Sequence, residues 1–124
     1  MVLGVGTDIL DISRIEGVYQ RRGRRFCEKI LTPYELERMD RQKNPIRFLA
    51  KRFCAKEAVS KALGTGMKSG VSFLQIEIRR NNKGVPDVRL SQEALEVFKR
   101  SKASKLSLSI SDEKDYAVAF AILS

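Results

Sequence analysis

Histidine is absent from the 124 residues of this chain. A protein without histidine cannot use a Ser-His-Asp or Cys-His nucleophile system, a histidine metal site or a histidine general base. Acid–base chemistry would therefore fall to Asp, Glu, Lys or bound water. A metal held by the remaining oxygen ligands would be Mg²⁺ or a similar hard cation.

Cysteine is scarce, and long apolar runs are missing. Cys27 and Cys54 lack the spacing of zinc ligands, and we expect buried thiols rather than a disulfide. The longest apolar run, near residues 116–123, has the length of a strand and not of a membrane span. The N-terminus lacks the basic segment and apolar core of a secretory signal. The length and these absences predict one domain over residues 1–124, located in the cytoplasm and not in a membrane.

Positive charge is in excess, with a formal net charge of +9. Residues 1–62 hold 14 Lys and Arg against 8 Asp and Glu, and four arginines lie within five positions: Arg21, Arg22, Arg24 and Arg25. Such a surface favours an acidic partner, which can be nucleic acid, an anionic membrane surface or an acidic protein. A solvated basic surface without a partner explains any single arginine equally well.

The chain begins with an alternating segment, residues 2–11, which predicts a strand. We expect its core face to carry Leu3, Val5, Thr7 and Ile9. On the opposite face, Gly4 and Gly6 would clear space beside Asp8 for a ligand or another backbone. The alternative is a glycine-weakened edge strand with a surface aspartate.

The next segments predict helices, followed by a mostly antiparallel sheet. A first helix is expected from Ser13, its cap, to about Gln20, with Glu16 completing a capping box, and a second over 24–31. A third is expected to start at Thr32-Pro33, and a fourth to run from Asn44-Pro45 to near Leu63. Strands over 73–79 and 87–90 flank a turn at 81–84, a helix follows over 91–102, and strands close the chain over 105–111 and 116–123. The predicted fold is α+β, with one early strand and one long central helix.

A carboxylate lies on the apolar face of the long central helix. Leu49, Ala50, Phe53 and Cys54 cluster on one side, and Glu57 falls among them with Lys61 one turn further on. A carboxylate in such a place is costly unless it is paired or holds a metal. The same two residues also form a favourable i, i+4 pair of the kind found on solvated faces, and Lys51, Arg52 and Lys56 would suit a charged surface helix. Periodicity alone leaves both interpretations open.

Three segments match one family pattern when they are taken together. They are GTDILDISRI at 6–15, RFLAKRFCAKEAVSKALGTG at 47–66 and SLSISDEKDYAVA at 107–119. The chain resembles the holo-[acyl-carrier-protein] synthase family, the small bacterial type of 4′-phosphopantetheinyl transferase, over nearly its whole length. The resemblance implies the fold of that family and transfer of the phosphopantetheine arm of coenzyme A to a serine of apo-acyl carrier protein, for fatty acid biosynthesis.

The resemblance also implies roles for particular residues. Asp8 and Glu57 would hold Mg²⁺ against the pyrophosphate, and Lys61 would stabilise a phosphate oxygen or protonate the leaving group. The serine proton would go to Glu57 or to a metal-bound water, of which we favour the water because a carboxylate on Mg²⁺ is a weak base. The residues implied for coenzyme A are Phe48, Arg52, Lys61, Gly64, Thr65, Gly66, Gly84, Pro86, Ser109 and Ser111, although Phe48 is explained as well by ordinary packing. Many relatives have histidine where this chain has Asp112, so a catalytic histidine is excluded here.

Partners follow from the same resemblance. Arg14, Arg21, Arg24 and Arg25 match the basic region that docks the strongly acidic carrier protein. Family members of this size are homotrimers with active sites at subunit interfaces. The competing hypothesis is a non-enzymatic basic module for nucleic acid, supported by the charge alone. It lacks an aromatic RNP-like strand and leaves Asp8 and Glu57 unexplained, because carboxylates repel phosphates unless a cation intervenes.

Overall fold

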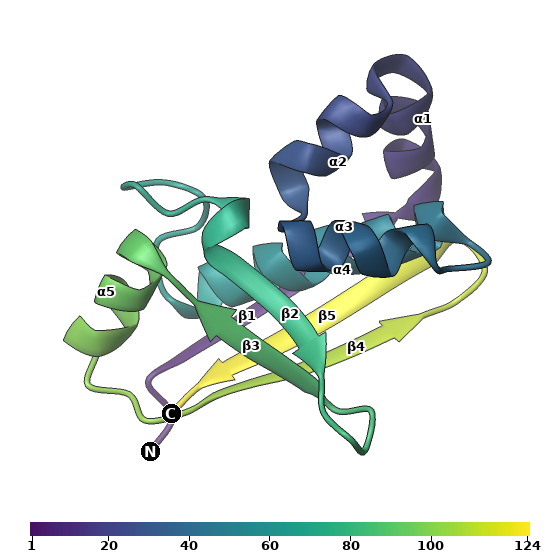
Figure 1. The fold of residues 1–124 in the computed structure, drawn as a ribbon. Helices are drawn as coiled ribbons and strands as arrows, with labels where there is room; N and C mark the ends of the chain where they lie inside the picture. The colour runs from purple at the N-terminus through teal and green to yellow at the C-terminus, as the bar shows by residue number, and fades with distance from the viewer.

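Five strands and five α-helices make up the computed structural model, which describes residues 1–124 (Figure 1). Their order is β1 (Gly4–Asp11), α1 (Ile12–Arg22), α2 (Arg24–Ile30), α3 (Pro33–Asp40), α4 (Pro45–Ala62), a 3₁₀ turn (Phe73–Gln75), β2 (Ile76–Arg80), β3 (Pro86–Leu90), α5 (Gln92–Arg100), β4 (Leu106–Asp112) and β5 (Tyr116–Leu123). This confirms the predicted α+β class. No helix is both long and apolar enough to cross a membrane.

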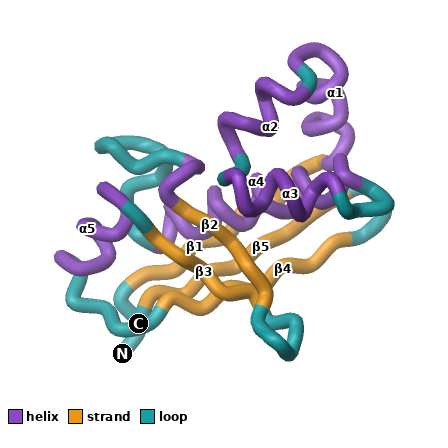
Figure 2. Tube along the Cα trace, viewed as in Figure 1, coloured by secondary structure: helices purple, strands orange, loops and turns teal.

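The main sheet has three antiparallel strands in the order β1-β5-β4. Helix α4 lies against one face of this sheet, with the hairpin β2–β3 crossing β4 (Figures 1 and 2). Strand β5 turns four small or apolar residues toward α4, and all four are buried: Ala117, Ala119, Ala121 and Leu123. Alanines on this face let the helix approach the sheet closely, which places α4 at the centre of the molecule.

Strand β1 corrects the predicted orientation of its two faces. Gly4, Gly6, Asp8 and Leu10 face α4, whereas Val5 and Ile9 are 58% and 67% exposed. A Cβ atom on Gly6 would collide with the carbonyl oxygen of Ala58, and one on Gly4 with that of Ala62. The glycines therefore clear space for another backbone, that of α4, which is the second of the two predicted uses of that space. The branched side chains are left on the outer face of the sheet.

The helix starts are mostly as predicted. Thr32 and Glu35 form the expected capping box, and Asn44 caps α4 through a hydrogen bond from the Arg47 amide. The predicted Ser13 cap with Glu16 is wrong. Asp11 caps α1 instead, because β1 runs directly into the helix and leaves no residue between them.

The second half of the chain forms a separate two-stranded sheet, β2–β3, as the turn at 81–84 predicts. The predicted strand over 73–79 is wrong in its first three residues, which form a 3₁₀ turn. From there Ile76 and Ile78 enter the core, whereas Leu74 stays 46% exposed. The helix predicted over 91–102 is α5, but its Ser91 side chain makes no capping hydrogen bond.

The core contains an ion pair that the sequence did not suggest. Lys56 is fully buried and donates hydrogen bonds to Glu35 Oε1 at 2.6 Å, to Ile30 O at 2.6 Å and to Phe73 O at 3.1 Å. Arg52 is also buried. The interpretation of Arg52 and Lys56 as surface charges is therefore wrong. The two cysteines are free and buried, as expected.

Candidate functional site

The structure brings Asp8, Glu57 and Lys61 together where β1 meets α4. The Lys61 ammonium donates to Asp8 Oδ1 at 3.2 Å and to Thr7 O at 2.9 Å, and so pairs with Asp8 rather than with Glu57. Its side chain is 48% exposed, against 17% for Asp8. Lys61 is thus an accessible cation that two oxygens hold beside a recessed carboxylate.

Glu57 shares this recess. Burial raises the pKa of its carboxyl, the charge of Asp8 raises it further, and Lys61 lowers it again only in part. Two carboxylates in one half-buried place repel each other unless a cation lies between them. Oxygen ligands of this kind suit Mg²⁺, which takes one or two carboxylates and completes its shell with phosphate oxygens and water. The donor set therefore fits a hard divalent cation.

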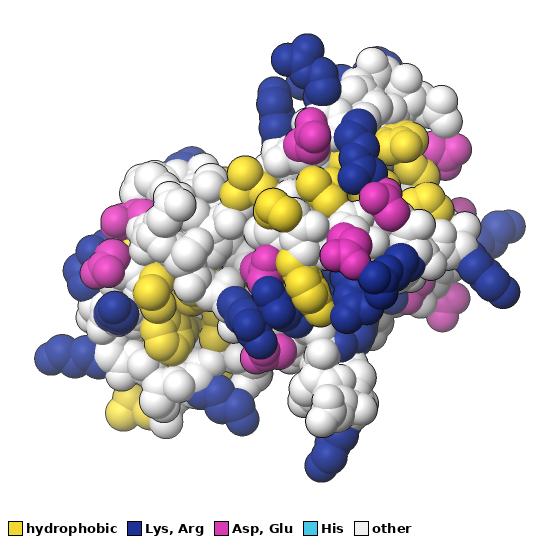
Figure 3. All heavy atoms as spheres, in the orientation of Figure 1, with side chains coloured by type: hydrophobic (Ala, Val, Ile, Leu, Met, Phe, Trp, Pro, Cys, Tyr) yellow, Lys and Arg dark blue, Asp and Glu magenta, His cyan; other side chains and the backbone are white.

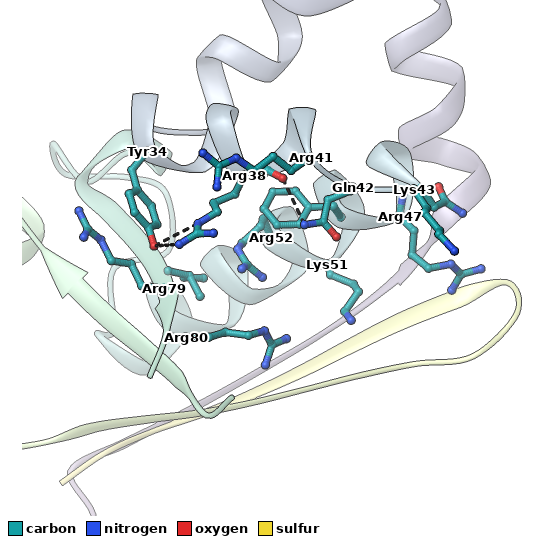
Figure 4. A pocket seen from close by; sticks show the side chains of 13 residues that line it. Tyr34, Arg38, Arg41, Gln42, Lys43, Arg47, Lys51, Arg52, Arg79 and Arg80 are labelled. Carbon is teal, nitrogen blue, oxygen red and sulfur yellow. Dashed lines mark hydrogen bonds between the residues drawn. The ribbon is translucent and has the colours of Figure 1, made fainter. Parts of the chain in front are cut away.

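A second feature is a basic cleft between α3, α4 and β2, with a volume of about 710 Å³. Its lining has eight cationic side chains and no carboxylate: Arg38, Arg41, Lys43, Arg47, Lys51, Arg52, Arg79 and Arg80. Figure 4 shows how these side chains surround it, and Figure 3 shows Lys and Arg gathered beneath α3 on the same face. Such a lining favours a ligand with several negative charges.

Arg52 is the most deeply placed cation of the cleft. Its guanidinium lies 4.5 Å from the centroid of the Phe48 ring, and its Nε is buried without a hydrogen-bond partner. Burial lowers the pKa of Arg52 to about 10, and the nearby Glu35 charge offsets part of that effect. Two of the ten residues predicted for coenzyme A, Phe48 and Arg52, thus meet in this cleft.

Asp112 lies just behind the cleft wall. Its carboxylate accepts a hydrogen bond from Arg47 at 2.8 Å and is 3.4 Å from the Lys51 ammonium. Arg47 also donates to the carbonyls of Glu113 and Lys114, so the start of α4 is tied to the β4–β5 turn. Burial raises the pKa of the Asp112 carboxyl, but the two cations outweigh burial and leave it below its usual value.

The other predicted nucleotide residues lie apart from Asp8. Gly64, Thr65 and Gly66 follow the end of α4, and the amide of Gly66 donates to Ser60 O. Gly84 and Pro86 belong to the β2–β3 hairpin. Ser109 and Ser111 pair with Phe120 and Val118, on the sheet face turned away from α4.

Three of the four predicted docking arginines are exposed on α1 and α2 without an ion pair: Arg14, Arg21 and Arg25. Arg24 differs because its guanidinium makes two hydrogen bonds to Asp40, at 2.6 and 3.1 Å. Part of its charge is therefore neutralised within the chain.

Sequence reasoning missed most of the basic cleft and the buried pair beneath it. Tyr34, Arg38 and Arg79 form one end, where the Arg79 guanidinium lies 3.7 Å from the centre of the Tyr34 ring and Arg38 donates to the Tyr34 hydroxyl. These residues come from two distant segments, and only folding unites them. For Lys56 a signal existed, because it lies seven residues from both Leu49 and Leu63, on a buried helical stripe.

Comparison with known proteins gives a consistent family. The 4′-phosphopantetheinyl transferase superfamily matches residues 4–121. A holo-[acyl-carrier-protein] synthase of Buchnera aphidicola subsp. Schizaphis graminum is 48% identical over 98% of this chain and 97% of its own length.

Solved structures agree with this family. A holo-[acyl-carrier-protein] synthase from Neisseria meningitidis superimposes with a TM-score of 0.93 at 40% identity, covering 100% of this chain and 99% of its own. One from Bacillus anthracis, in complex with CoA (3′,5′-ADP), has a TM-score of 0.83 at 39% identity and covers 99% of this chain and 96% of its own.

Proposed function

The chain belongs to the 4′-phosphopantetheinyl transferase superfamily, and from this premise we infer that it is a holo-[acyl-carrier-protein] synthase. It transfers the 4′-phosphopantetheine group of coenzyme A to a serine of apo-acyl carrier protein, and adenosine 3′,5′-bisphosphate is the other product. The observation that carries this function is the grouping of Asp8, Glu57 and Lys61 in a chain of this family. The comparisons give no support to a nucleic-acid-binding module.

Mg²⁺ is part of the proposal, with Asp8 and Glu57 as its protein ligands. When bound, the ion would neutralise charge on the pyrophosphate oxygens. The raised pKa of Glu57 supports this role, since burial and then the charge of Asp8 disfavour its carboxylate, and a cation between the two carboxylates would offset both effects.

The reaction exchanges one phosphorus–oxygen bond for another. The serine hydroxyl oxygen bonds to the β-phosphorus of coenzyme A, and the bond to the adenosine bisphosphate oxygen breaks. Lys61 can turn from Asp8 to a phosphate oxygen, where it stabilises negative charge or gives a proton to the leaving group. The serine proton goes to a base, for which the chain offers Glu57 or water.

The basic cleft would receive the nucleotide phosphates of coenzyme A. Arg52 supports this assignment because its guanidinium lines the cleft and makes no hydrogen bond within the chain. Planar guanidinium groups suit phosphate because they offer two parallel donors. The glycines after α4 and the β2–β3 hairpin remain proposed contacts of the same ligand.

The acidic carrier protein would dock on α1 and α2. Arg14 and Arg21 support this surface because both are exposed and neither makes an ion pair within the chain. Complementary charge speeds association and makes it sensitive to salt.

We also propose a homotrimer with active sites at subunit interfaces. The outer face of the main sheet supports it, since Val5, Ile9, Val118 and Phe120 are all at least 38% exposed there. Ser109 and Ser111 lie on the same outer face, so they can complete a site only in a neighbouring subunit. A single domain over residues 1–124 and a cytoplasmic location stay predictions.

The function is tested by mass spectrometry of apo-acyl carrier protein after incubation with this chain, coenzyme A and Mg²⁺. We expect the carrier to gain the mass of one phosphopantetheine group, and a variant of the carrier with alanine at its acceptor serine to gain none. Tight, salt-dependent DNA binding without any mass gain would overturn the proposed function.

A further inference from the structure

Two buried cations share one buried carboxylate behind the basic cleft. Lys56 Nζ lies 2.6 Å from Glu35 Oε1, whereas Arg52 Nε is 4.0 Å from Glu35 Oε2. The exposed fractions of these side chains are 0% for Lys56, 1% for Glu35 and 7% for Arg52. The three charges sum to +1, and Glu77, the other carboxylate whose charge acts on Lys56, already pairs with Arg79.

The Glu35 carboxylate is already engaged by other donors. Oε1 accepts from Lys56 and from the Thr32 amide, and Oε2 accepts from the Ile78 amide at 2.9 Å. A carboxylate offers about four lone-pair sites, and three of them are filled in this way. One site on Oε2 stays open, but Arg52 Nε is 4.0 Å away from that oxygen, which gives an electrostatic contact and no hydrogen bond.

The unsatisfied guanidinium faces the ligand cleft. Arg52 lines it together with Lys51 and Arg80 (Figure 4). The Phe48 ring lies against the guanidinium, with its centroid 4.5 Å away. The Nε that lacks a partner lies on the Glu35 side and is closed off from solvent, so an anion in the cleft would meet the terminal nitrogens of the guanidinium.

We propose that Lys56 is a positioning residue for coenzyme A binding. By holding Glu35, Lys56 keeps that carboxylate from closing on Arg52, which leaves the Arg52 guanidinium available for a nucleotide phosphate. The inference rests on the proposed function, in which Arg52 contacts the phosphates of coenzyme A. It assigns a reason to a lysine that touches no substrate and lies inside the core.

The first test replaces Lys56→Met, which keeps the length of the side chain and removes its charge. Glu35 then has only Arg52 as a cationic partner and should draw it out of the cleft. We expect the KM for coenzyme A to rise about tenfold, with kcat and the KM for carrier protein within about twofold of wild type. An unchanged KM for coenzyme A would overturn the proposal.

The second test is the neutral pair Glu35→Gln/Lys56→Met, which removes the competing carboxylate as well. The KM for coenzyme A should return to within about twofold of the wild-type value. If Glu35 instead held Arg52 in place by attraction, the double variant would bind coenzyme A about tenfold more weakly, and the proposal would fail. Where Lys56→Met does not fold, a weaker affinity of the double variant for coenzyme A still overturns the proposal.

Two further measurements distinguish a failure of this inference from a failure of the proposed function. The Mg²⁺ concentration for half-maximal activity should be the same in all three proteins, which shows that the adjacent Glu57 is undisturbed. Absence of transfer by the wild-type chain would remove the proposed function itself. If the wild-type chain transfers normally and neither variant changes the KM for coenzyme A, only the role of Lys56 is overturned.

Discussion

Two lysines of α4, only five residues apart, make ion pairs of opposite character. Lys56 is fully buried, lies 2.6 Å from Glu35 and donates to two further carbonyls. Lys61 is 48% exposed and contacts Asp8 at 3.2 Å. The first pair has every donor used and no access to solvent, whereas the second can exchange its partner for a phosphate.

The difference shows that burial, more than residue type, decides whether a charged side chain stabilises the fold or is available for catalysis. A buried pair is held by its surroundings, because neither partner can be released into water without a large cost. A half-exposed pair contributes little to stability, so its lysine is free to act elsewhere. Substitutions on the two pairs should therefore change different measured quantities.

The largest expected effect is on stability, from Lys56→Met alone. It leaves the Glu35 carboxylate buried without its contact cation, so the free energy of unfolding should fall by about 3–5 kcal/mol. Urea denaturation followed by circular dichroism measures this, and Glu35→Gln/Lys56→Met should recover most of the loss. A loss of less than about 1 kcal/mol would show that this buried pair contributes no more to stability than an exposed pair does.

Glu57→Gln should act on turnover and leave stability intact. Loss of one carboxylate from the cation site should lower kcat about a thousandfold, by analogy with removal of a strong electrostatic group at other active sites. The melting temperature should stay the same or rise, because burial and Asp8 disfavour the charged form of Glu57. Near-normal turnover at saturating Mg²⁺ would remove both proposed roles of Glu57.

Lys61→Met should lower kcat about a hundredfold, because the phosphate oxygen loses its cation or proton donor. The free energy of unfolding should change by less than about 1 kcal/mol, as expected for a half-exposed pair. Steady-state kinetics and urea denaturation of the same preparation measure the two effects. A large loss of stability with unchanged kcat would show that Lys61 has a structural role and no role in turnover, which contradicts the assignment.

Arg14→Glu should have the smallest effect, which should be confined to the binding of carrier protein. The KM for carrier protein should rise about fivefold to tenfold at low salt, and the difference should shrink as ionic strength increases. Lys99→Glu, on the distant helix α5, changes the net charge equally and should leave this KM unchanged. Equal effects of Arg14→Glu on the KM for coenzyme A would argue against the docking role.

Much of the fold was predictable because its signals are local. Capping residues and prolines mark the starts of α3 and α4, and a short apolar run marks β5. The face of β1 was not predictable in this way, since its branched side chains belong to the outer surface and its glycines to the helix contact. An isolated strand does not reveal which face its helix will cover.

The site was predictable in part for a related reason. Asp8, Glu57 and Lys61 were found from their unusual positions and from the family resemblance, and the structure brings them together. The alternative interpretation, an i, i+4 pair of Glu57 and Lys61 on a solvated face, is wrong, because Lys61 pairs with a recessed aspartate on the neighbouring strand. The basic cleft joins residues that are 45 or more positions apart, such as Tyr34 and Arg79, which no local pattern connects.

The central claim is that Asp8 and Glu57 form a cation site that works in phosphopantetheine transfer. The direct measurement is a Mg²⁺ titration of transfer by wild type and by Asp8→Asn, with coenzyme A and carrier protein saturating. We predict that Asp8→Asn needs at least about tenfold more Mg²⁺ for half-maximal rate, since the amide is a weaker ligand than the carboxylate. An identical Mg²⁺ dependence in the two proteins, or full transfer by wild type in excess chelator, would contradict the claim.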